Sequence, residues 1–276
     1  MHILCTFDLF PVYIQSVMKL KLVFFIAGFI LYLPNLKAQK TYSSTVTEFI
    51  FSSGNVQFTD AFLSQYPDAK TIKTDLRFTA FFHICQDWHI DFTNNIGVIT
   101  GLGLRNVGLI SDEVLPDPNN TSSLLDYKII RRLYTLGVPL AFKLGSFKDH
   151  IFFYGGGELE MALHYKEKYW TNTHSRKGDK AVYTSWFGEQ TPLILPSVFG
   201  GIQLPKGINI KVKYYINNFL SNSYKRSGND NEFNVSDLTR YKKSQVFYLA
   251  LSMQFNTAYI TKKDWKPEKE EVVAYY

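Results

Sequence analysis

Cysteine is scarce in this sequence: Cys5 and Cys85 are the two cysteines among 276 residues. So few thiols exclude a disulfide-rich scaffold and a zinc site built from cysteines. Excess charge of one sign is also small. The formal net charge is +6, and residues 1–38 contribute +2 of it through three lysines and one aspartate. The remaining charge is mild and dispersed, so we expect no nucleic-acid partner.

The sequence lacks an apolar run long enough for a membrane-spanning helix. Its apolar run at 22–33 has 12 residues, whereas a spanning helix needs ~20. Lys19 and Lys21 precede this run and Ala38 follows it, which is the order of a secretory signal peptide. We therefore expect residues 1–38 to be a signal peptide with its true start at Met18. An uncleaved membrane anchor is the alternative.

Aromatic residues, by contrast, are abundant at 16 % of the chain. Large apolar side chains alternate with small or polar ones along several segments, which is the period of a β-strand. In 130–144, for example, the even positions are mostly large and apolar and the odd positions are mostly small or charged. The pattern predicts strands at about 76–92, 96–111, 128–145, 150–167, 192–204, 208–221 and 244–257.

Connections between these strands alternate in length. Short turns at 93–95, 146–149 and 205–207 each give a hairpin register that keeps the apolar faces of both strands on one side. The connections at 111–127, 168–190 and 222–243 are longer and polar, and we expect them to be loops.

The hairpin around 146–149 has a definite expected register. It pairs Arg131 with His164 and Thr135 with Glu160. In the turn at 205–207, we expect Gly207 to hold the left-handed backbone conformation.

An even strand count requires one more strand before 76–92. Outer-membrane barrels have short turns on the periplasmic side, so a strand must first rise from that side, and 44–58 is the candidate. These strands are also longer than the ~5–6 residues common in soluble proteins. A soluble sandwich or lipocalin-like barrel, with its apolar face turned inward, is the alternative.

The segments Ile99–Gly108 and Tyr134–Lys143 carry a resemblance: from about 70 to 257 the chain resembles the porin-like outer-membrane β-barrel family of Gram-negative bacteria. The resemblance implies an all-β fold, an antiparallel up-and-down transmembrane barrel of about eight strands at 39–257. It implies an outer-membrane location. The alternating connection lengths predict short periplasmic turns and long extracellular loops, and the polar composition of 258–276 predicts a periplasmic tail.

Partners follow from the same resemblance. It implies contact with outer-membrane lipid and, during insertion, with the barrel-assembly machinery. We expect a monomer whose extracellular ligand the sequence does not identify. The resemblance brings no catalytic residue with it.

Charged residues cluster on the faces expected to line the lumen. Buried carboxylates need partners, so Glu158 and Glu160 are expected to pair with inward cations, although two nearby carboxylates could instead serve acid–base catalysis. Eight strands leave an interior just wide enough for side chains, which favours a filled lumen over a wide pore. The predicted lumen charge network comprises Arg105, Arg131, Lys143, Glu158, Glu160, His164, Lys211 and Lys213.

These observations favour a barrel without enzymatic activity or cofactor, whose role is structural or a surface interaction through its extracellular loops. A narrow channel for small solutes is one alternative. A membrane-embedded lipid-modifying enzyme is another, but it needs a Ser-His-carboxylate set, and the outward faces hold almost no histidine. His83 and His89 lie ~20 Å apart along one strand, too far for one metal ion.

Overall fold

The structure, a computed structural model, describes residues 40–259 except 70–71, 81, 119, 172, 174, 178–179 and 227–233. The expected signal peptide at 1–38, its start at Met18, and residues 260–276 of the expected tail lie outside the described residues. The described elements are β1 (Lys40–Phe58), α2 (Asp60–Gln65), β2 (Lys73–Asp75), β3 (Arg77–Thr79), β4 (Ile84–Asp91), β5 (Ile96–Asp117), β6 (Asn120–Ser146), β7 (Ile151–Thr171), β8 (Lys180–Trp186), β9 (Ile194–Gln203), η2 (Pro205–Gly207), β10 (Ile208–Tyr215) and β11 (Tyr241–Tyr259).

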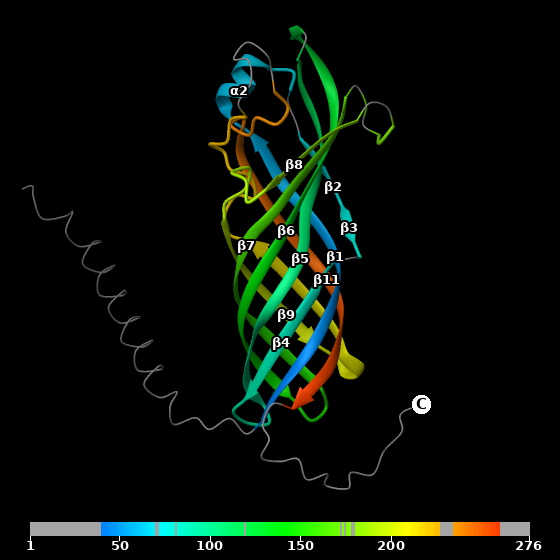
Figure 1. Cartoon of the computed structure of the whole chain (residues 1–276), viewed down its shortest axis with the longest axis vertical. Coiled ribbons are helices and arrows are strands. Elements are labelled where there is room, and N and C mark those ends of the chain that lie inside the picture. The colour runs from blue at the N-terminus through cyan, green and yellow to red at the C-terminus, as the bar shows by residue number, and fades with distance from the viewer. Residues whose placement is uncertain are drawn as a thin grey trace, which may run out of the picture. The chain divides into compact units, whose positions relative to one another are not determined.

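Within the described residues, eight strands form a closed antiparallel ring. The order around the ring is β1, β4, β5, β6, β7, β9, β10 and β11, and β11 pairs back with β1 (Figure 1). Closure removes the free sheet edges, and the predicted up-and-down barrel of about eight strands is confirmed. The weakest predicted strand, 44–58, is β1 and runs from Lys40 to Phe58.

The outer wall of this ring carries a belt of exposed apolar side chains. On β6, Val138 is 52 % exposed, Leu140 60 % and Phe142 55 %, while Ala141 and Lys143 face inward and are buried. The same arrangement continues on β10 and β11, where apolar side chains face outward. A soluble barrel buries its apolar face inside, so the soluble alternative is excluded.

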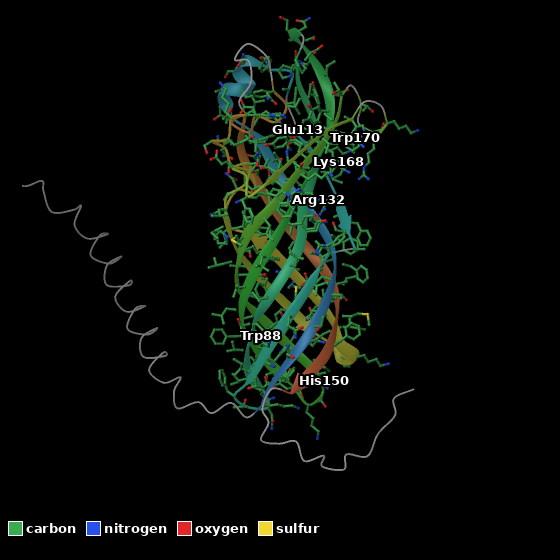
Figure 2. The ribbon with its side chains drawn as sticks, in the orientation of Figure 1. Trp88, Glu113, Arg132, His150, Lys168 and Trp170 are labelled. Atoms are coloured by element: carbon green, nitrogen blue, oxygen red, sulfur yellow. The ribbon has the colours of Figure 1, made fainter. Side chains whose placement is uncertain are left out.

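The belt has the height of a bilayer core. A strand rises ~3.3 Å per residue, so Leu136 to Leu144 on a strand tilted by ~40° spans roughly 20 Å, near the ~25 Å of an outer-membrane barrel's apolar band. Above the belt the outer wall turns basic at Arg132 and Lys168, and Trp88 lies toward the opposite end (Figure 2). The fold is a transmembrane barrel of the outer-membrane type.

One end of the barrel has only tight connections among the described residues. The turns are 93–95, 147–150 and η2. In η2, Lys206 has φ 63° and Gly207 has φ 78°, so the expected left-handed glycine is present and its neighbour shares the conformation. In the described part of the chain, no helix is long and apolar enough to span a membrane.

The opposite end differs from the expected loops. Residues 111–127 are not a loop: β5 and β6 continue through them as a long hairpin that closes where Asp117 pairs with Asn120. The polar composition that suggested a loop arises because this hairpin projects beyond the bilayer, where the outer face meets water. Its inner face stays buried, as Glu113 and Leu115 at 0 % exposure show.

This end is packed around its own apolar core. We call the barrel above the belt, together with α2 and segments 216–226 and 234–240, the cap. Thr59 caps the N-terminus of α2 by accepting from the Phe62 backbone N–H at 3.2 Å, and the Phe58 and Phe62 rings lie 4.6 Å apart. The buried cap residues include Phe58, Phe62, Ala69, Leu115, Tyr127, Phe219, Leu220, Val235, Leu238 and Tyr241.

The register between β6 and β7 corrects the expected pairing. A β-bulge leaves Leu163 unpaired, since Tyr134 pairs with His164 but Thr135 pairs with Ala162. Above the bulge every β7 side chain changes face. Below the bulge the pairing is already shifted by two residues from the expected register, so Glu160 pairs with Gly137 and not with Thr135. The bulge adds one residue to this shift, and Arg131 faces Glu167 and not His164.

The wall between β4 and β5 contains a seam. Backbone pairing ends at Ile84 with Leu104 and resumes where β2 pairs Asp75 with Ile110. The predicted strand 76–92 is interrupted here, and Phe82 has φ 66° at the break. Side chains close the seam, because Arg77 and His83 hydrogen-bond to Asn106.

Candidate functional site

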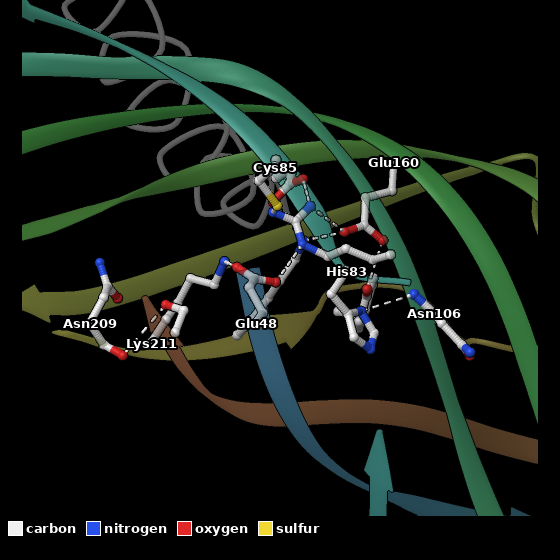
Figure 3. Close-up of polar contacts among 12 residues, drawn as sticks. Glu48, His83, Cys85, Asn106, Glu160, Asn209 and Lys211 are labelled. Carbon is white, nitrogen blue, oxygen red and sulfur yellow. Dashed lines mark hydrogen bonds and ion pairs between the residues drawn. The ribbon is translucent and has the colours of Figure 1, made fainter. Parts of the chain in front are cut away.

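A buried ion network crosses the lumen at the level of the belt. Arg105 Nε lies 3.0 Å from Glu48 Oε2, and its Nη1 contacts Glu158 and lies 3.4 Å from Glu160 Oε1. Lys213 Nζ lies 2.7 Å from Glu158 Oε2 and also contacts Glu160. Lys211 completes the set by contacting Glu48 (Figure 3).

The network is balanced in charge. Three cations, Arg105, Lys211 and Lys213, meet the three carboxylates Glu48, Glu158 and Glu160. Pairing of this kind offsets the large desolvation cost of each ion. Neutral donors add to it, since Tyr215 Oη donates to Glu160 Oε2 at 2.7 Å. The six side chains are at most 9 % exposed, so solvent barely reaches them.

Little space remains beside this network. A cavity of about 30 Å³ borders Glu48, Arg105 and Lys211, which is room for about one water. Closer to the turns, a wider vestibule of about 240 Å³ lies between Tyr42, Phe152 and Gln254. The network therefore occupies the lumen between this vestibule and the cap.

A second network lies in the cap. Arg131 Nε lies 2.9 Å from Glu167 Oε2 and its Nη1 lies 3.0 Å from Glu113 Oε1. Tyr241 Oη donates to Glu113 Oε2 at 2.6 Å. Burial raises the pKa of Glu113, but Arg131 and Arg240 outweigh it and hold the pKa below its usual value. The cap interior is thus fixed by charge as well as by apolar packing.

A smaller polar cluster lies near the turns. Lys143 Nζ lies 2.5 Å from Asp91 Oδ1, 3.1 Å from Tyr42 Oη and 3.2 Å from His89 Nδ1. His89 also approaches Ser44, with 2.9 Å between Ser44 Oγ and His89 Nε2. Lys143 is therefore paired close to the vestibule.

The predicted lumen residues separate into three groups. Arg105, Glu158, Glu160, Lys211 and Lys213 meet at the belt, whereas Arg131 lies in the cap and Lys143 near the turns. His164 joins none of them. The bulge at Leu163 turns it to the outer wall, where its ring centroid lies 4.6 Å from that of Trp186.

Several members of the networks were missed by the sequence reasoning. Glu48 lies in the strand with the weakest alternation, and Glu113 lies in the segment expected to be a loop. Glu167 lies beyond the bulge, and a strict period of two places the odd positions of this strand on the outer face. A buried carboxylate opposite each inward arginine is the signal that could have found them.

The site geometry bears on chemistry. Glu158 and Glu160 both contact cations and are 3 % and 0 % exposed, so a substrate has no access to them. Within the described residues, no group of three His, Cys, Asp or Glu side chains is placed to hold a metal ion. Cys85 is buried, and its sulfur lies 3.1 Å from Arg105 Nη2.

No family model matches the sequence, and neither does any curated protein. Among solved structures, the chain is similar to Ail, the attachment invasion locus protein of Yersinia pestis, with 13 % identity, 78 % of this chain and 99 % of that chain covered, and a TM-score of 0.30. It is also similar to Ail in complex with the heparin analogue sucrose octasulfate, with 14 % identity, 79 % of this chain and 100 % of that chain covered, and a TM-score of 0.31. The outer membrane protein OprG from Pseudomonas aeruginosa is similar with 10 % identity, 80 % of this chain and 99 % of that chain covered, and a TM-score of 0.33. The barrel assignment rests on this chain's own strand pairing.

Proposed function

We propose that this protein is a closed outer-membrane anchor that holds a rigid cap outside the cell for contact with an extracellular partner. The observation that carries the proposal is the continuity of packing. The belt network fills the lumen, and the buried core and the Arg131 network continue above it into the cap. Side chains that fill the lumen obstruct ion conduction, whereas they hold the cap in a fixed shape for binding.

The lumen filling argues against the channel alternative. The charged side chains that could line a pore form ion pairs with one another, and the cavity beside them has room for about one water. The enzyme alternative lacks a reachable pair of carboxylates, because Glu158 and Glu160 are buried and paired.

Planar-bilayer recording of the purified, folded chain tests the closed lumen. We expect no steady single-channel steps at neutral pH. Regular steps of one amplitude would overturn the closed anchor and favour the narrow channel.

Antibody labelling of intact cells tests which end faces outward. We expect labelling of a tag inserted in the β5–β6 turn and none of a tag at Ser146–Asp149 in the β6–β7 turn. The reverse pattern would place the cap in the periplasm and defeat the proposal.

A further inference from the structure

Three cations stand together on the outer wall just above the belt. Arg132 on β6 is directly opposite Lys166 on β7, and Lys168 lies one outward position farther from the belt, opposite Ile130. Figure 2 labels Arg132 and Lys168 on this part of the wall. Directly opposed like charges destabilise a sheet, so this cation cluster costs stability when nothing neutralises it.

No carboxylate of the described residues forms an ion pair with the cation cluster. The nearest acids on this face, Asp75 and Asp112, are both engaged by Lys128, each at 2.8 Å. The cross-strand neighbours on the other sides are uncharged, with Gly108 opposite Arg132.

Two further observations show that the cluster is unsatisfied. Arg132 Nε is buried without a hydrogen-bond partner. Burial and the neighbouring cations Lys166 and Lys180 lower the pKa of Lys168. On β8, Thr184 and Val182 are the residues opposite Lys166 and Lys168, and neither supplies negative charge.

An aromatic ledge separates the cation cluster from the belt. The ring centroids of Tyr134 and His164 lie 6.0 Å apart, and Trp186, next to His164, is 69 % exposed. The Arg132 guanidinium lies 4.8 Å from the Tyr134 ring centroid. Aromatic side chains of this kind occupy the headgroup level of a membrane, so the cation cluster lies at the depth of lipid phosphates.

We propose that Arg132, Lys166 and Lys168 bind the phosphate of an anionic lipid in the outer leaflet, with its acyl chains on the belt below. Arginine offers paired N–H donors in the geometry of a phosphate, and lysine adds point charges. The apolar contact surface is already present at Leu136 and Leu159, which are 37 % and 60 % exposed. The outer-leaflet assignment rests on the proposed outward orientation of the cap, and the site stands whether or not the lumen conducts.

Native mass spectrometry of the folded, detergent-solubilised protein tests this site. The probes are dioleoyl phosphatidic acid and dioleoylglycerol, which share their acyl chains and differ in the phosphate. We expect the unmodified protein to bind the phosphatidic acid at least tenfold more tightly. Equal binding of the two lipids would overturn the proposal.

The matched variants remove equal charge. Arg132→Gln/Lys166→Gln/Lys168→Gln should lose the tenfold preference, whereas Lys148→Gln/Lys206→Gln/Lys242→Gln, away from the cluster, should keep it. Loss of preference in both variants would reduce the effect to bulk charge and defeat the site. Heat-modifiable migration on a gel reports folding. If the triple variant is misfolded, Lys166→Gln and Lys168→Gln, which break no ion pair of the described residues, carry the same comparison.

Competition with inorganic phosphate distinguishes a site for a lipid phosphate from a site for a free phosphate ion. We expect it to leave the bound lipid in place at a hundredfold excess, because it lacks chains to contact the belt. Displacement at equal concentration would show a free-anion site and overturn the lipid assignment.

Discussion

Arg77 holds Asn106 by both its backbone and its side chain. The Arg77 Nη2 donates to the Asn106 side-chain oxygen at 2.7 Å, and Nη1 donates to the Asn106 backbone carbonyl at 3.2 Å. The Asn106 backbone N–H donates to His83 Nδ1 at 3.2 Å. Two side chains therefore replace the strand that is missing at the seam between β4 and β5, and the barrel stays closed without a continuous ladder.

Replacing Arg77 should weaken this seam. In Arg77→Ala the buried Asn106 acceptors lose their donor, and an unsatisfied buried polar group costs ~1–3 kcal/mol. We expect a loss of that size in urea unfolding from lipid vesicles. The exposed Arg176→Ala should change stability by less than ~0.5 kcal/mol, and equal losses for the two variants would contradict a sealing role for Arg77.

The belt network predicts a strong coupling between Lys213 and Glu160. Lys213→Met removes one of the two cations that pair with the buried Glu158 and Glu160 and leaves the network with one uncompensated negative charge, which costs ~3–5 kcal/mol. Adding Glu160→Gln to it should restore part of that loss, so the two effects are not additive. A coupling energy of ~0.5–3 kcal/mol is expected from a double-mutant cycle of vesicle unfolding. Simple additivity would show that their contact contributes nothing to stability.

Arginine substitutions along β6 should reveal depth in the membrane. Val138→Arg places a charge near the middle of the belt and should cost ~2–4 kcal/mol, whereas Leu144→Arg near its end should cost ~0–1 kcal/mol. Both side chains are exposed, at 52 % and 62 %, so burial in protein does not separate them. Vesicle folding measures both, and equal penalties would contradict the position assigned to the bilayer.

Acid should release β2 from the cap. The hydrogen bond from Lys128 lowers the pKa of Asp75 below its ordinary value, so the pair stabilises β2 fully above the unfolded pKa of ~3.9. That stabilisation is lost as the pH falls through the lowered folded pKa. The hydrogen-exchange protection factor at Lys73–Asp75, which is corrected for the pH dependence of intrinsic exchange, should stay constant from pH ~7 to ~4 and fall below it. Asp75→Asn should abolish this acid-dependent step, and a step that survives would exclude the pair as its cause.

The alternation of apolar and polar residues predicted those strands that have lipid along the whole of one face and the lumen along the whole of the other. On β10, lipid meets Ile208 and Val212 while the lumen holds Lys211 and Lys213, and this contrast is visible in the sequence. The contrast fades above the belt, where water replaces lipid. Polar residues then occur on the outer face, and a strand such as the upper part of β5 has the composition of a loop.

The candidate site was predictable in part for a related reason. Arg105 and Glu160 could be placed inward because each lies on a strand with clear alternation, but their contact depends on strand order and tilt. Glu48 belongs to a strand whose small residues on both faces weaken the pattern. The seam at Asn106 depends on a backbone break near Phe82, and no local sequence period records it.

The unpaired Leu163 reverses which positions of β7 face the lumen. Below it the even positions enter the lumen, and above it the odd positions do, which is how Glu160 and Glu167 both come to lie inside. Deleting that one residue would therefore restore a single alternation along the whole of β7. It would carry Lys166 and Lys168 into the cap interior and turn Tyr165 and Glu167 outward. The length of the chain at this point encodes more of the fold than the identity of the side chain does.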